Sequence, residues 1–268
     1  MKTAICMIVK NEEKSIAEWI AYHLAIGFNS VILFDNASTD RTPFIIAHFT
    51  RRYDVRRINW KVTNPLYQMQ AYDFALKSFR TEFDWICFID SDEFVVPLHS
   101  ILINEFLGSF PDVSAMAVNW ACFGSSGYLT RPKGLIIESF LQRSETSFAP
   151  NRHVKSFVRP VNTIRSINPH YFEVRGKYVT PHGMLVEWAS PGITTGEPVF
   201  DAIQINHYFI KSAEQWEEKM VRGYHDTKRT GSETIFKNYD RNEVKDTAIL
   251  SFLSTTEAII TQTLEEEL

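Results

Sequence analysis

Three carboxylates stand within four positions at the end of an apolar run. The stretch DWICFIDSDEF carries five apolar residues directly into Asp90, Ser91, Asp92 and Glu93. Like charges this close repel each other, so water, a basic partner or a metal ion must offset them. In extended chain residues i and i+2 point to one side, so Asp90 and Asp92 can converge on one ligand. Carboxylate oxygens that leave positions for phosphate and water suit a hard divalent cation.

Four polar clusters, including the acidic cluster above, follow apolar runs in the first 97 residues. They are KNEE from Lys10, DNASTD from Asp35, NPLYQ from Asn64 and DSDE from Asp90. Ligands of open parallel sheets bind at the carboxyl ends of the strands. If the runs are parallel strands, the four clusters therefore line one site.

The elements expected before these clusters alternate between strand and helix. Strands are predicted at 3–10, 30–35, 55–60 and 84–90, and helices at 11–27, 42–49 and 65–79. Ser15 and Glu18 fit a capping box at the first helix, and Gly27 ends it. Such alternation, with apolar runs that lack polar gaps, predicts an α/β fold with a mostly parallel central sheet covered on both faces.

The pattern changes after Pro97. A helix is expected at 100–110, a strand at 114–123 and a late helix at 211–226, where Ser212 and Gln215 fit a second capping box. The mixed charges of the late helix indicate a solvated face, and the tail 264–268 indicates a solvated helix end. We expect residues 1–268 to form one domain, with a more irregular half after residue 97.

Composition excludes several classes of protein. The chain has 28 Lys and Arg against 32 Asp and Glu, a net charge of −4, so it has no overall basic field for nucleic acid. Cys6, Cys87 and Cys122 form no CxxC pair and indicate buried thiols in a reducing compartment. The apolar run Ala4–Val9 is too short for a signal peptide or a membrane span. We therefore expect a cytoplasmic protein, with room for peripheral contact at the inner face of a membrane.

Several motifs together resemble glycosyltransferases of the GT-A fold. VKNEE, FDNASTD and FIDSDEF resemble the family 2 and family 92 group, and NWACFGSSG, VKSFVRP, PHYF and INHYFIKSAEQW are closer to family 92 than to ordinary family 2. The resemblance covers roughly residues 3–225. Ordinary family 2 enzymes often carry an Asp-Asp pair after the second strand, where this chain has FDNAS.

The resemblance implies an inverting, hexosyltransferase-like enzyme. It would move a sugar from a nucleotide-diphosphate donor, a UDP-sugar, to a hydroxyl of a glycan or lipid-linked acceptor, with Mn²⁺ or Mg²⁺ as cofactor. Residues 1–97 would then be the nucleotide-sugar-binding half and residues 98–268 the acceptor-side half. Many animal family 92 members have a membrane anchor that this sequence lacks, so we expect a bacterial-type enzyme that builds surface polysaccharide or lipid-linked glycan.

Carried over to this sequence, the resemblance surrounds the donor with polar side chains. Those expected at the nucleotide are Lys10, Asn11, Glu12, Asp35, Asn36, Gln68, Asp73, Asp90 and Ser91. Asp90, Asp92 and His207 would bind the metal, and an imidazole among carboxylates favours Mn²⁺. Lys155 would contact the departing diphosphate. The competing interpretations are a solvated turn for Asp90 and Asp92, a turn and helix cap for the residues after Asp35, a structural histidine and a surface lysine.

The catalytic base is the least determined role. Inversion calls for a carboxylate opposite the leaving group. Glu138, after the FGSSG loop, is the first candidate and Glu173 the second, although capping a helix would also explain Glu138. Trp120 and Tyr128 would serve either as an acceptor platform or as core packing.

Two other functions compete with sugar transfer. A nucleotidyltransferase that makes nucleotide-sugars would open with a glycine-rich loop and a basic residue after the first strand, whereas KNEE has no glycine. A non-catalytic sugar- or nucleotide-binding module would leave the acidic pair, the late histidine and the candidate bases unexplained. Hydrolysis of a UDP-sugar without acceptor would separate an enzyme from a binding module.

Overall fold

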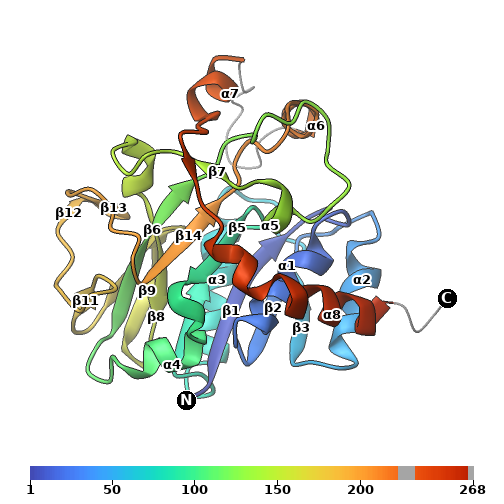
Figure 1. The fold of residues 1–268 in the computed structure, drawn as a ribbon. Helices are drawn as coiled ribbons and strands as arrows, with labels where there is room; N and C mark the ends of the chain where they lie inside the picture. The colour runs from blue at the N-terminus through green and yellow to red at the C-terminus, as the bar shows by residue number, and fades with distance from the viewer. Residues whose placement is uncertain (223–232, 265–268) are drawn as a thin grey trace.

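The computed structural model describes residues 1–222 and 233–264 (Figure 1). Its main sheet has nine strands: β1 Thr3–Val9, β2 Ser30–Asp35, β3 Val55–Asn59, β4 Trp85–Phe88, β5 Glu93–Pro97, β6 Ala115–Cys122, β8 Val154–Val158, β11 Tyr178–Val179 and β14 Ile203–His207. The order is β3-β2-β1-β4-β8-β6-β14-β5, with β11 beside β6. Strands β1 to β4 pair in parallel, as do β6 and β14, whereas β8 and β5 run antiparallel to their neighbours.

Helices and three small sheets surround this sheet. The helices are α1 Ile16–Ala25, α2 Thr42–Thr50, α3 Tyr67–Ser78, α4 Ile103–Gly108, α5 Ile136–Ser139, α6 Ala213–Arg222, α7 Glu233–Tyr239 and α8 Leu253–Leu264. Single 3-10 turns occur at Leu98–Ser100, Ala149–Arg152, Pro160–Asn162 and Ala248–Phe252. The two-stranded sheets pair β9 Thr163–Asn168 with β10 Tyr171–Val174, β12 Trp188–Ser190 with β13 Ile193–Thr194, and β7 Gln142–Arg143 with β15 Val244–Lys245. Within residues 1–222 and 233–264, no helix combines the length and apolar character needed to cross a bilayer.

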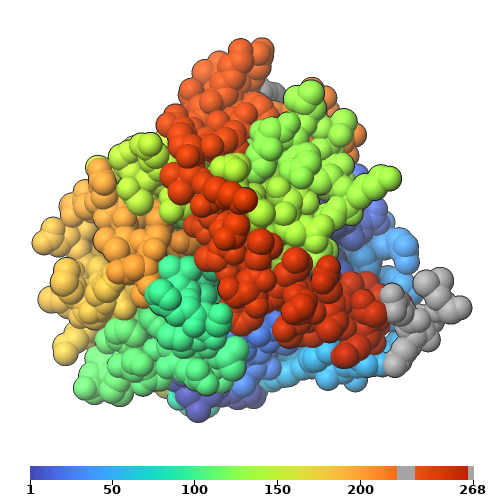
Figure 2. All heavy atoms as spheres, viewed as in Figure 1, coloured from blue at the N-terminus to red at the C-terminus, as the bar shows by residue number. Residues whose placement is uncertain are grey.

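Both faces of the sheet are buried, which explains the uninterrupted apolar strands. Ile5 and Met7 of β1 pack with α1, α2 and α8 on one face, and Ala4 and Cys6 pack with α3 on the other. Helix α8 brings the end of the described chain back against α1 and α2, and Figure 2 shows it covering that face. The predicted fold class, a mostly parallel sheet between helices with an irregular second half, is confirmed.

The boundaries of the first half follow the prediction closely, and those of the second half less so. The four strands and three helices expected before residue 90 all form, in the expected order. Strand β5 was not predicted, and the helix expected at 100–110 is the shorter α4. The late helix begins at Ala213, and residues 223–226 of its predicted range lie outside the described residues. Residues 265–268 of the predicted tail also lie outside them.

Strand β14 connects the two halves. It lies between β6 and β5, and its last residue, His207, pairs in register with Glu93 on one side and Cys122 on the other. The register of a sheet fixes which residues of distant segments meet. The late histidine is therefore held beside the DSDE cluster by backbone pairing.

One of the two predicted capping boxes is wrong. The Ser15 hydroxyl donates to the Glu12 carboxylate at 2.8 Å and caps no backbone N–H of α1. The Glu18 carboxylate instead accepts a hydrogen bond from the backbone N–H of Ile137 at 2.8 Å, because α5 packs against this end of α1. The second box is confirmed, since the backbone N–H of Gln215 donates to the Ser212 hydroxyl at 3.2 Å.

Glu18 should make the stability of the fold depend on pH. Burial raises the pKa of this carboxyl from 4.5 to about 7, against the backbone hydrogen bonds that lower it. An acid with a raised folded-state pKa contributes stability that is complete below pH 4.5 and is lost as the pH rises through 7. We expect Glu18→Gln to remove about 3 kcal/mol of this pH dependence. Urea unfolding of both proteins at pH 5 and pH 8 measures it, and equal differences for the two would contradict the assignment.

Candidate active site

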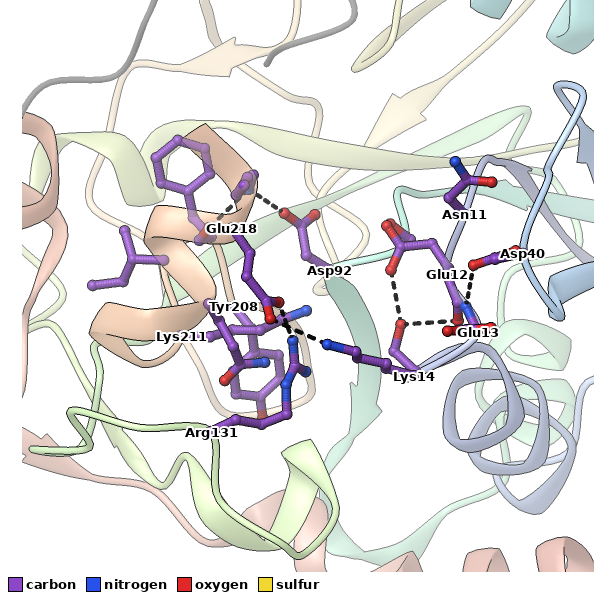
Figure 3. Close-up of a pocket in the computed structure, with 16 residues that line it drawn as sticks. Asn11, Glu12, Glu13, Lys14, Asp40, Asp92, Arg131, Tyr208, Lys211 and Glu218 are labelled. Carbon is purple, nitrogen blue, oxygen red and sulfur yellow. Dashed lines mark hydrogen bonds and ion pairs between the residues drawn. The ribbon is translucent and has the colours of Figure 1, made fainter. Parts of the chain in front are cut away.

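Two adjoining pockets lie beside the carboxyl ends of the strands. The first, of about 320 Å³, we call the His207 pocket; it is lined by Ile8, Val9, Lys10, Glu12, Asn36, Tyr67, Gln68, Asp90, Ser91, Asp92, Trp120, Pro169, His170, His207, Phe209 and Lys219. The second, of about 250 Å³, we call the Lys211 pocket (Figure 3); it is lined by Asn11, Glu12, Glu13, Lys14, Ser15, Asp40, Ser91, Asp92, Arg131, Tyr208, Phe209, Ile210, Lys211, Gln215, Glu218 and Lys219. The residues common to both are Glu12, Ser91, Asp92, Phe209 and Lys219.

The ends of the strands bring these residues together, as the order of the polar clusters predicted. Lys10 follows β1, Asn36 follows β2, and Asp90 to Asp92 lie between β4 and β5. His207 is the last residue of β14. The two pockets thus meet where four strands of the main sheet end.

A buried lysine offsets part of the acidic cluster. The Lys155 ammonium lies 2.5 Å from Oδ2 of Asp90 and 3.2 Å from Oε2 of Glu93, and neither the Lys155 nor the Glu93 side chain is exposed. Burial lowers the pKa of Lys155, but the two carboxylates outweigh burial and raise it above its usual value. Gln68 donates to the other oxygen of Asp90 at 2.8 Å. Lys155 is therefore no surface cation, and it lines neither pocket.

Asp92 has a different set of partners. Its Oδ2 accepts a hydrogen bond from Lys219 at 2.9 Å, and its Oδ1 lies 3.7 Å from Nε2 of His207. Burial raises the pKa of Asp92, but the charge of Lys219 is the largest opposing effect, and the nearby cations together hold this pKa well below its usual range. Burial lowers the pKa of His207 to about 4, so its imidazole is neutral at pH 7. An anionic carboxylate and a neutral imidazole therefore face each other.

The loops after β1 and β2 support each other. Asn11 has a left-handed backbone, with φ of 54°, and its Oδ1 accepts a hydrogen bond from the Thr39 backbone N–H at 2.8 Å. Asp35 is buried and accepts from the Ser38 backbone at 2.9 Å and from Arg57 at 2.7 Å. Of the two residues predicted at the end of β2, Asn36 thus lines the His207 pocket, whereas Asp35 stabilises the turn that follows the strand.

Several predicted residues lie outside both pockets. Asp73 accepts hydrogen bonds from the backbone and hydroxyl of Ser166, at 2.7 and 2.8 Å, and so fastens α3 to β9. Glu138 is exposed on α5. Glu173 pairs at 2.8 Å with Arg165, and the two side chains are 44% and 63% exposed. The roles predicted for these three carboxylates therefore stay predictions that the pockets do not support.

Of the two aromatic residues predicted at the site, one lines a pocket and the other does not. Trp120 lines the His207 pocket, with its ring 4.1 Å from that of His207 and stacked on His153 at 4.9 Å. Tyr128 lines neither pocket and packs its edge against Phe140. Of the pair, Trp120 alone is placed to meet a ligand in either pocket.

Sequence reasoning missed two lysines. Lys211, just before α6, lines the Lys211 pocket, and Lys219, within α6, lines both pockets. The solvated face predicted for this helix is only partly correct, because Gln215 and Trp216 are buried. Lys211, Gln215 and Lys219 recur every four residues, the spacing of one helix face. That spacing, which begins at Lys211 shortly after INHY, could have indicated from the sequence that these lysines lie near the site.

Comparisons with known proteins identify the family. Residues 2–266 match the model of glycosyltransferase family 92, and the chain belongs to this family. A family 92 protein of Oryza sativa subsp. japonica is 27% identical over 221 residues, 80% of this chain and 34% of that protein. One of Ricinus communis is 27% identical over 230 residues, 81% of this chain and 37% of that protein. The chain thus spans about a third of the length of these curated relatives.

Among solved structures, S. aureus TarS 1–349 in complex with UDP aligns with a TM-score of 0.39 and 18% identity. The alignment covers 60% of this chain and 47% of that chain.

Removal of the buried lysine should weaken the fold. We expect Lys155→Met to destabilise the protein by about 3–5 kcal/mol, because it leaves Glu93 buried beside Asp90 without a cation. Urea unfolding measures the loss. The double variant Lys155→Met with Glu93→Gln removes one uncompensated charge and should recover part of it. A single variant within 1 kcal/mol of the wild type, on the order of a surface ion pair, would contradict the buried-pair interpretation.

Proposed function

We propose that this domain transfers a sugar, with inversion, from a nucleotide-diphosphate donor to a hydroxyl of a glycan or lipid-linked acceptor. The observation that carries the proposal is the meeting of Asp92 and His207 at the His207 pocket, where the strands end, in a chain of glycosyltransferase family 92. The donor is a UDP-sugar, as the resemblance implies. A cytoplasmic location, with peripheral contact to a membrane that carries the acceptor, belongs to the same proposal.

The His207 pocket suits a nucleoside. Ile8, Val9 and Tyr67 offer apolar surface, and the amides of Asn36 and Gln68 offer donors and acceptors in the same wall. Small-molecule sites typically combine an apolar lining with a few placed polar groups. Asp90 and Asp92 line the same pocket, so a nucleoside bound there would have these carboxylates within reach of its diphosphate.

Asp92 and His207 fit a divalent cation. Their facing atoms are 3.7 Å apart, and two metal–ligand bonds of about 2.1 Å reach across such a gap. Among the described residues no cluster of three or more His, Cys, Asp and Glu side chains forms a metal cage, so phosphate oxygens and water would complete the coordination. Asp90 keeps its predicted place at the ribose or the metal. When bound, Mn²⁺ or Mg²⁺ would neutralise charge on the leaving diphosphate.

The transfer itself replaces one bond by another. The acceptor oxygen forms a bond to the anomeric carbon as the bond to the diphosphate oxygen breaks, and a base takes the hydroxyl proton. We keep Glu138 as the first candidate base, because the segment that leads into α5 also supplies Arg131 to the Lys211 pocket. Glu173 remains second, since Arg165 already pairs with it.

Nucleotide binding tests the donor class. Calorimetry with UDP, GDP, CDP and ADP, each with Mn²⁺ and with a chelator, should give tight and metal-dependent binding of UDP. Slow hydrolysis of a UDP-sugar without acceptor should accompany it and would exclude a binding module. No binding of any of the four nucleotides under either condition would overturn the proposal.

Substitutions of Asp92 and His207 test whether these two residues bind a metal ion. Asp92→Asn should abolish metal-dependent turnover and leave the fold intact, and His207→Ala should weaken Mn²⁺ binding less severely. Lys219→Met is the control for the ion pair, since Lys219 competes for the same carboxylate. It should bind Mn²⁺ at least as tightly as the wild type. Unchanged turnover in Asp92→Asn, or normal Mn²⁺ affinity in His207→Ala, would remove that residue from the metal site.

A further inference from the structure

The Lys211 pocket contains one cation that no described residue neutralises. Lys14 and Arg131 pair with Glu218 at 3.1 and 2.5 Å, as the dashed lines in Figure 3 mark. Lys219 pairs with Asp92 at 2.9 Å. Within residues 1–222 and 233–264 the ammonium of Lys211 has no ion pair or hydrogen bond. The pocket wall therefore presents one positive charge that is open to a ligand.

The acidic residues of this pocket are already engaged. Glu13 accepts a hydrogen bond from the Arg41 backbone at 2.9 Å, and Asp40 accepts one from the Thr42 backbone at 2.9 Å. Glu12 accepts hydrogen bonds from two serine hydroxyls, at 2.8 and 3.2 Å. These neutral donors hold the carboxylates in place without removing their charge, so a ligand in the pocket meets fixed carboxylates and one ammonium that has no ion pair among the described residues.

The backbone at Lys211 is itself unusual. Its φ of 57° is left-handed, a conformation that costs a residue with a side chain about 1–2 kcal/mol. Glycine or asparagine would make the same turn into α6 with less strain. The turn alone therefore does not explain a lysine here, whereas strained positions of this kind cluster at ligand sites.

Burial of Lys211 also favours an anionic partner for its ammonium. Burial lowers the pKa of Lys211, and the nearby carboxylates of Glu12 and Asp92 only partly offset this. A cation removed from water is unfavourable unless an anion pairs with it. An anionic ligand would supply that pairing through charge-assisted hydrogen bonds.

We propose that Lys211 binds a phosphate group, namely the sugar-linked phosphate of the donor diphosphate. The proposal rests on the function proposed above. Ser91, Asp92 and Lys219 form part of the wall shared by the two pockets, so a diphosphate that leaves the His207 pocket past Asp92 enters the Lys211 pocket. Lys211 then stabilises the diphosphate as a leaving group from the Lys211 pocket, whereas His207 lines the other pocket.

The test compares UDP with UMP, because only UDP has the second phosphate. Calorimetry with Mn²⁺ should show Lys211→Met and Lys211→Asn binding UDP about 10- to 100-fold more weakly, and UMP within about twofold of the wild type. Asparagine accepts the left-handed backbone, so Lys211→Asn should unfold thermally no earlier than the wild type. Lys14→Met, which removes a lysine of the same pocket that already pairs with Glu218, should leave both affinities within about twofold.

Three results would overturn the assignment. Equal weakening of UDP and UMP would make Lys211 a residue of the fold. Unchanged UDP affinity in both variants would remove it from the diphosphate. If the wild type saturated with UDP bound further inorganic phosphate, and Lys211→Met did not, the phosphate would belong to the acceptor. A wild type that binds no UDP would overturn the proposed function as well, whereas these three results leave it standing.

Discussion

Everything at the site depends on how the carboxylates between β4 and β5 are compensated. Asp90 and Glu93 meet the buried ammonium of Lys155, and Asp92 meets Lys219. The two lysines come from β8 and α6, far along the chain. A cluster of charges with buried partners is stable only when all of them are in place. The site therefore does not exist until the second half of the chain has packed onto the first.

Strand pairing in the main sheet also makes the site depend on the second half of the chain. Because β8 pairs with both β4 and β6, Lys155 enters beneath the acidic cluster, and because β14 pairs with both β5 and β6, His207 arrives at its side. The hydrogen-bond ladders fix these placements to within one residue, since a slip of one would turn each side chain to the other face. Changes at the buried pair of Lys155 and Glu93 should thus affect folding and ligand binding together, whereas the more exposed pair of Asp92 and Lys219 contributes less to folding.

The sequence predicted the first half of this arrangement because its physics is local. Apolar runs, helix periods and turn residues are each contained in a window of a few residues, and the rule that ligands gather at strand ends then placed Lys10, Asn36, Gln68 and Asp92 at a common site. The second half depends on pairing between distant segments. Strands β5, β8 and β14 are five residues each and carry no period of their own, so neither the burial of Lys155 nor its partners could be deduced. The first capping box failed partly for the same reason, because Glu18 bonds to a segment far along the chain, although the Ser15 hydroxyl itself is engaged by nearby Glu12.

Lys155, Lys211 and Lys219 differ in one respect that bears on function. Lys155 and Lys219 each have a carboxylate partner, so their charges are used in holding the protein together. An internal ion pair of that kind contributes little net field to a ligand, because each charge screens the other. Lys211 has no such partner among the described residues, and it lies next to the wall that both pockets share. Among the described residues, the Lys211 pocket therefore retains one cation without an ion pair, and in the proposed reaction it lies where the negative charge of the leaving diphosphate would develop.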